Sequence, residues 1–288
     1  MAGSNLAQQT FDLCNEGMIA NRGTRGRSGA LVTLTGADGD EIVISTDIHG
    51  QRLNFEKLVE IADLANCPRR HLLMQEVCHG GPTYPDGGGC MSHLVLEDVI
   101  RLKKEFPDRF HFILSNHELA EVMDFPIAKG NRMLNLQFRC GIEQMYGEQA
   151  EEVRHHYMDF LLSCPLAVRL ENGVFISHSA PEGVDRDGFD IEILNRNRLL
   201  ADDMKPGGAA FQLVWGRDFR PRNAQVFAKL VEASILIHGH EPCKEGFYVP
   251  NNQQIILDCC GPNPVFVMIP IAEEITHRDV VNRIQPLS

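Results

Sequence analysis

The chain has 288 residues, of which 43% are hydrophobic and 23% charged, a balance typical of globular proteins with a large core. Its net charge of −12 argues against a broad electrostatic attraction to nucleic acid or to an anionic membrane surface. We see neither an apolar run of roughly 20 residues that could span a bilayer nor a signal-like N-terminus, so we expect a cytoplasmic protein.

The nine cysteines are scattered and contain no C-x-x-C pair. This pattern argues against a disulfide framework and against a thiolate zinc site.

The first forty residues are expected to form a helix over 5–20, a basic loop, and a hairpin strand. In this hairpin, residues 30–35 (ALVTLT) pair with residues 41–46 (EIVIST) across an Asp-Gly turn. The loop carries Arg22, Arg25 and Arg27. These arginines could meet an anionic partner, although a solvated loop is the simpler expectation.

From residue 41, apolar strands alternate with amphipathic helices. We expect helices over 52–65 and 92–105 and strands over 41–46, 71–77 and 110–116. Strand, helix, strand, helix, strand is the βαβ rhythm of a mostly parallel sheet.

The second half contains helical segments and further strands. We expect helices within 120–165 and over 190–202, and a hairpin within 166–181 with an Asn-Gly turn and a second strand that ends in His178. We also expect a strand that ends in His238 and His240, and a final strand pair from 253–261 and 265–272. The fold class is therefore α/β, with a two-layered mixed β-sheet core flanked by helices. We divide the chain into residues 1–40 and a main domain over 41–288, both within a single globular unit.

Polar side chains follow the expected strands at the points where they end. They are Asp47, His49, Glu76, Asn116, His117, His178 and His240. Each alone could be a polar turn residue, but all seven are residue types that bind metal ions or carry protons. Mixed oxygen and nitrogen ligands around a shared carboxylate suit two neighbouring Mn, Fe or Zn ions, which in such sites lie about 3.5–4 Å apart and act on phosphoryl groups.

The segments DIHG (47–50), SNHE (115–118), ISHS (176–179) and HGHEP (238–242) occur in an order that resembles the calcineurin-like metallophosphoesterases. The similarity is strongest to their phosphoprotein phosphatase branch. The resemblance implies a metallophosphoesterase-like β-sandwich with α-helices and two metal ions.

The same resemblance assigns roles to individual residues. It places Asp47, His49 and Glu76 on the first metal, and Glu76, Asn116, His178 and His240 on the second. It makes His117 the general acid and gives Arg217 and Asn116 contacts with the substrate phosphate.

One segment departs from this pattern. QEVCHGG (75–81) stands where the family reads G-D-x-x-D-R-G. Glu76 is longer than the usual aspartate, Gly80 replaces a phosphate-binding arginine, and His79 replaces the aspartate that orients the catalytic histidine. A second imidazole lowers the proton affinity of His117 unless another carboxylate is near, and Glu118 and Asp86 are candidates.

The leading hypothesis is a dinuclear metal-dependent phosphoesterase that uses a metal-bridging hydroxide and His117 as general acid. Its substrate would be a phosphomonoester, either a phosphorylated small molecule or phosphoserine or phosphothreonine in a phosphoprotein. Phosphodiester or dinucleoside polyphosphate cleavage ranks lower, since His238 is expected in the core. The alternative is a weakened relative that binds metal or a phosphorylated partner without turnover, and loss of all metal is disfavoured. Nucleic acid and membrane are not expected partners, and metal identity and oligomeric state stay open.

Overall fold

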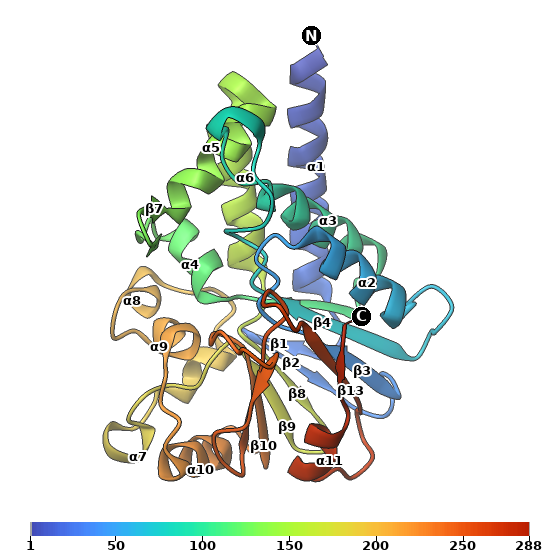
Figure 1. The fold of residues 1–288 in the computed structure, drawn as a ribbon. Helices are drawn as coiled ribbons and strands as arrows, with labels where there is room; N and C mark the ends of the chain where they lie inside the picture. The colour runs from blue at the N-terminus through green and yellow to red at the C-terminus, as the bar shows by residue number, and fades with distance from the viewer. Residues whose placement is uncertain (1, 288) are drawn as a thin grey trace.

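Two β-sheets pack face to face, with helices outside them (Figure 1). The computed structural model describes residues 2–287, with side chains for 5–85 and 87–287. The predicted α/β fold with a two-layered mixed sheet core is confirmed.

The larger sheet has seven strands. In spatial order they are β1 (Arg27–Ser28), β2 (Leu31–Leu34), β8 (Ala167–Leu170), β9 (Val174–Ser177), β10 (Ile235–His238), β12 (Gln254–Leu257) and β11 (Phe247–Tyr248). The smaller sheet has five: β14 (Ile284–Pro286), β13 (Val265–Pro270), β3 (Glu41–Ile44), β4 (Arg70–Gln75) and β5 (Phe110–Ile113).

Aliphatic side chains from both sheets fill the space between them. Ile42 and Ile44 of β3 belong to the same buried cluster as Ile176 of β9 and Ile237 of β10. Strands that are buried on both faces read as continuous apolar runs, which is why these segments lack polar alternation.

The long helices lie outside the two sheets. They are α1 (Ala2–Gly23), α2 (Arg52–Ala62), α3 (Ser92–Glu105), α5 (Leu134–Tyr146), α6 (Ala150–Ser163) and α10 (Pro221–Leu230). The short ones are α4 (Asn116–Val122), α7 (Val184–Asp187), α8 (Ala201–Met204), α9 (Ala209–Trp215) and α11 (His277–Asn282). In Figure 1, α1 stands upright beside α3 and α6, which it contacts. Across residues 2–287, no helix combines the length and the apolar character needed to cross a membrane.

Several predicted pairings are confirmed. β3, β4 and β5 are parallel neighbours, as the βαβ rhythm required. β8 and β9 form the expected antiparallel hairpin.

The predicted hairpin between residues 30–35 and 41–46 is wrong. β2 pairs in parallel with β8, whereas β3 lies in the other sheet between β4 and β13. The final strand pair is wrong for the same reason, since β12 and β13 belong to different sheets. In both cases the chain passes from one sheet to the other at a turn that looked local.

Two helical segments also differ from expectation. Residues 190–202 contain a 3-10 turn (Ile191–Asn195) and the start of α8 instead of one helix. Residues 120–165 are interrupted by a small hairpin of β6 (Ala128–Lys129) and β7 (Arg132–Met133).

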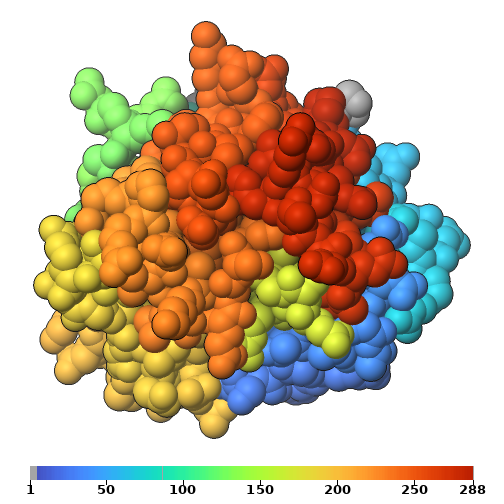
Figure 2. Space-filling model, turned by 90° about the horizontal axis from the view of Figure 1, so that it is seen from below, coloured from blue at the N-terminus to red at the C-terminus, as the bar shows by residue number. Residues whose placement is uncertain are grey.

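The turn between β8 and β9 joins the two layers. Seen from below in Figure 2, this yellow-green turn emerges between the blue N-terminal strands and the red C-terminal segment. The Asn172 side chain donates to the carbonyl oxygen of Pro270 at 2.7 Å, and Glu171 accepts the Gly36 N–H at 2.7 Å. Segments far apart in sequence are thereby held together at this end.

Candidate active site

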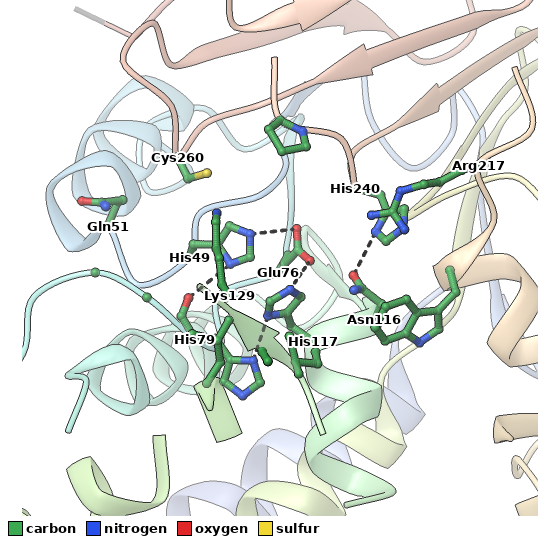
Figure 3. A pocket seen from close by; sticks show the side chains of 17 residues that line it. His49, Gln51, Glu76, His79, Asn116, His117, Lys129, Arg217, His240 and Cys260 are labelled. Atoms are coloured by element: carbon green, nitrogen blue, oxygen red, sulfur yellow. Dashed lines mark hydrogen bonds and ion pairs between the residues drawn. The ribbon is translucent and has the colours of Figure 1, made fainter. Parts of the chain in front are cut away.

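The seven strand-end residues come together where the carboxyl ends of strands from both sheets meet. Asp47 and His49 follow β3, Glu76 follows β4, and Asn116 and His117 begin α4 directly after β5. From the larger sheet, His178 follows β9 and His240 follows β10. Figure 3 shows His49 and His117 turned toward Glu76, and His240 turned toward Asn116.

The backbone is strained at this edge. Eight non-glycine residues in the described part of the chain have positive φ, and five of them are in the site: Asp47, His49, Glu76, His79 and His240. A positive φ is costly for residues with a Cβ and persists only where the surrounding structure imposes it. The sharp turns after the strands direct these side chains into one pocket.

One cluster of ligand atoms consists of His49, Glu76 and His117, all within 4.8 Å of one another. The Nε2 of His49 lies 3.5 Å from Oε2 of Glu76. The Nδ1 of His49 lies 3.2 Å from the carbonyl oxygen of His79. Because a carbonyl only accepts, Nδ1 carries the proton and Nε2 offers its lone pair to the pocket.

A second cluster consists of Glu76, His178 and His240, again within 4.8 Å. Oδ1 of Asn116 lies 2.6 Å from Nε2 of His178 and 3.1 Å from Nδ1 of His240. The other nitrogen of His178 lies 2.7 Å from Oε1 of Gln75. With the proton on that nitrogen, Nε2 of His178 and Oδ1 of Asn116 are two acceptors facing each other.

Asp47 belongs to neither cluster but lies at their border. Its Oδ1 accepts the backbone N–H of His240 at 3.0 Å and lies 3.9 Å from Nδ1 of His178. Burial and the charge of Glu76 raise the pKa of Asp47 well above its usual value. Burial likewise raises the pKa of Glu76 to about 8.

This donor set fits metal cations. Burial lowers the pKa of His178 to about 4, and burial also holds the pKa values of His117 and His240 below normal, so these rings offer lone pairs. Among the described residues, none hydrogen-bonds to the buried Nε2 of His240. A bound cation would remove the repulsion between facing acceptor atoms and between neighbouring carboxylates. Glu76 belongs to both clusters, so its carboxylate could contact a cation in each.

The clusters open into a pocket of about 420 Å³. Arg217 and Lys129 line it from different sides, together with the apolar side chains of Ile127, Leu134 and Trp215. Arg217 is also ion-paired with Glu241 and its side chain is 46% exposed. Arg217 therefore lines the pocket, and the Nε edge of its guanidinium is bonded to Glu241.

No family model matches the chain. Among curated proteins, serine/threonine-protein phosphatase 5 of Rattus norvegicus is 25% identical over 252 residues, and that of Homo sapiens is 25% identical over 253 residues. Each match covers 81% of this chain but 45% of the relative, so the chain spans less than half the length of the curated relatives it matches.

Solved structures show the same fold. A protein serine/threonine phosphatase from Saccharomyces cerevisiae matches with a TM-score of 0.72 at 15% identity, over 97% of this chain and 88% of that one. A cold-active protein-tyrosine phosphatase from a psychrophilic Shewanella matches with a TM-score of 0.57 at 13% identity, over 89% and 82% of the two chains. The resemblance to the phosphoprotein phosphatase branch is confirmed.

The segment 75–81 is where this chain departs from the phosphoprotein phosphatase pattern. Gly80 has φ of +100°, and no arginine reaches the pocket from that position. Lys129 of the β6–β7 hairpin lines the pocket. Sequence reasoning missed Lys129 because the hairpin itself was not recognised.

A second residue that sequence reasoning missed is Glu121 of α4, whose Oε1 lies 2.8 Å from Nε2 of His79. Of the two carboxylates suggested from sequence, Glu118 accepts the backbone N–H groups of Val77 and Cys78 and so shapes the turn after Glu76. The side chain of Asp86 lies outside the described residues. His238 is buried with Nδ1 3.1 Å from the Ser177 carbonyl oxygen, in the core as expected.

Proposed function

We propose that this chain is a metal-dependent phosphoesterase that hydrolyses phosphomonoesters, with phosphoserine or phosphothreonine in proteins as the favoured substrate class. The observation that carries the proposal is the convergence of buried acceptor atoms from both sheets on Glu76. Clustering of imidazole and carboxylate ligands without donors between them has little value for stability and much for binding cations.

The chain's residues divide into three roles. His49, Glu76, Asn116, His178 and His240, with Asp47 between the clusters, would hold two cations of the Mn, Fe or Zn type. Arg217 and Lys129 would bind the phosphoryl oxygens, since Arg offers paired donors and Lys a mobile point charge. His117, with Nε2 3.8 Å from Oε1 of Glu76, would donate a proton to the leaving alcohol. When bound, the cations would lower the pKa of water and neutralise phosphoryl charge.

The weakened relative stays the second candidate. Its support is the segment 75–81, where His79 and Gly80 replace two charged residues of the family pattern. Against it stands the presence of Glu121 behind His79 and of Lys129 at the pocket. We also propose that residues 1–40 work as one unit with the remainder, because the Arg27 guanidinium donates to the carbonyl oxygen of Ser163 at 2.6 Å.

The test is metal content together with turnover. Protein purified without chelator should hold transition metal, and it should hydrolyse p-nitrophenyl phosphate and a phosphoserine peptide in manganese. Asp47→Asn keeps an acceptor for the His240 N–H but removes a charge, so activity should fall by about a hundredfold or more, with metal loss. Asp38→Asn, in a turn remote from the site, is the matched control. A wild type that neither binds metal nor hydrolyses either substrate would refute the proposal.

A further inference from the structure

Glu121 is a buried carboxylate that the roles given above leave unused. It lies on α4 with no solvent exposure of its side chain. Its Oε1 lies 2.8 Å from Nε2 of His79, and its Oε2 lies 3.5 Å from Nε of Arg139. Burying a charged group costs folding free energy unless the charge is paired, so the position of Glu121 is unfavourable without a specific partner.

The contact continues into the pocket through His79. Nδ1 of His79 lies 2.8 Å from Nδ1 of His117. His117 and Glu121 are four residues apart on α4, so they lie on the same face, one turn from each other. His79, which enters from the turn after β4, stands between them.

The chemistry of the three groups fixes where the protons are. A carboxylate oxygen accepts, so the tautomer of His79 that fits its contact with Glu121 carries the proton on Nε2. A neutral imidazole has one N–H, so Nδ1 of His79 is an acceptor. The proton between the rings then belongs to Nδ1 of His117, and Nε2 of His117 is the nitrogen left to face the pocket.

His79 also fits sterically in the place of an aspartate. The Nδ1 atom of a histidine and the Oδ atoms of an aspartate are both two bonds from Cβ. Nδ1 of His79 can therefore accept from His117 where a carboxylate oxygen would have done so. Glu121 supplies the negative charge from the far side of the ring.

Resting on the proposed function, we propose that Glu121 and His79 are positioning residues that fix the ring and tautomer of His117. His117 rests neutral with Nε2 free. It takes up a proton at Nε2 from solvent and gives that proton to the leaving oxygen as the P–O bond breaks. It is then neutral, with the remaining proton on Nδ1 held by His79. The triad Glu121–His79–His117 thereby replaces a direct carboxylate–histidine pair.

The kinetic test uses the leaving group. A proton donor matters for an alkyl alcohol and little for p-nitrophenol, which leaves without protonation. In Glu121→Gln, kcat for a phosphoserine peptide should fall roughly tenfold to a hundredfold, while kcat for p-nitrophenyl phosphate falls less than about threefold. KM should stay unchanged for both. An equal loss on the two substrates would mean a merely structural role and would overturn the proposal.

Two further variants sharpen this result. Glu97→Gln removes another buried carboxylate, one that accepts from Tyr157 at 2.7 Å far from the pocket, and should not change the ratio of the two activities. His79→Asp combined with Glu121→Gln puts a carboxylate directly on His117 and should restore alkyl phosphate hydrolysis. His79→Asp alone would set two carboxylates against each other and should not.

A readout independent of turnover separates this proposal from the proposed function. In zinc-loaded protein with ¹⁵N-labelled histidine, NMR should show His79 protonated at Nε2 and His117 at Nδ1. The opposite tautomer on either ring would refute the triad, whether or not the protein is active. Correct tautomers in a protein that hydrolyses neither substrate would sustain the positioning of His117 and refute the proposed function.

Discussion

At the scale of single residues, Gly80 stands where the resemblance implies a phosphate-binding arginine, and its backbone conformation disfavours any side chain. Its φ is +100°, and a Cβ built there would lie 2.9 Å from the carbonyl oxygen of His49. An arginine at this position would strain the turn that holds His49 and Glu76. A cation from another element avoids that cost, and Lys129 on the β6–β7 hairpin reaches the same pocket.

Lys129 should therefore act mainly in binding the substrate phosphate. Lys129→Met is expected to raise KM for phosphoserine peptides by about tenfold with a smaller change in kcat, because an exposed point charge binds ground state and transition state alike. Steady-state kinetics in manganese would measure both constants.

The control for this prediction is Arg132→Met. Arg132 lies in the partner strand of the same hairpin but does not line the pocket. If both variants shift KM equally, the effect comes from the protein's overall charge and not from a contact with the phosphate.

The same scale shows what the sequence could reveal of the site. The strand-end residues were recognisable because each ends an apolar run, and the structure brings all seven together. Glu121 was missed because α4 was not delimited, although a signal existed. Ser115 and Glu118 have the S-x-x-E spacing of a helix start, and Ser115 does accept the His117 N–H at 3.2 Å. From that start, Glu121 falls one turn after His117.

At the scale of elements, helix and strand positions were easier to predict than strand partners. β2 and β3 are separated by a short Asp-Gly segment that favours a hairpin locally. Instead, β2 pairs with the distant β8 besides β1, and β3 pairs with the distant β13 besides β4. Periodicity reports the face of an element that is buried but says nothing of which distant strand will pair with it.

One buried lysine ties three elements together. Lys103 of α3 is 2% exposed and donates to Thr24 Oγ1 at 2.7 Å and to the carbonyl oxygens of Pro107 and Phe110 at 2.7 and 3.0 Å. It thus links α3 to the end of α1 and the start of β5. Lys103→Met removes the donor of all three hydrogen bonds and should lower the free energy of unfolding by about 2–4 kcal/mol.

Urea denaturation followed by circular dichroism would measure this loss. Lys104→Met is the matched control, since the neighbouring lysine is half exposed and pairs only with Glu16 on the surface. Its effect should stay within about 0.5 kcal/mol. Equal effects at the two positions would show that Lys103 does not link these elements.

At the scale of the whole molecule, the two sheets and the site depend on each other. The smaller sheet supplies Asp47, His49 and Glu76, and the larger supplies His178 and His240. Motif order was enough to predict that these residues meet. The packing that brings them together, through the aliphatic layer between the sheets, involves contacts between distant segments that no single stretch of sequence encodes.

Buried histidines outside the site should make the whole fold sensitive to acid. Burial lowers the pKa of His93 to about 4, and burial also lowers the pKa values of His71 and His111, which face each other at 2.9 Å. In the unfolded chain these groups take up protons near pH 6.5. Below that pH the unfolded state therefore binds more protons than the native state, and stability falls as pH falls.

The prediction is a loss of unfolding free energy between pH 6.5 and 4, with each such histidine contributing up to about 1.4 kcal/mol per pH unit. Urea titrations of chelator-treated protein at pH 7, 6 and 5 would measure the slope without bound metal. His93→Gln removes one titrating group, so its slope should be shallower than that of the wild type by up to that amount. An unchanged slope would mean that His93 takes up its proton in the folded state, which its burial beside Tyr84 opposes.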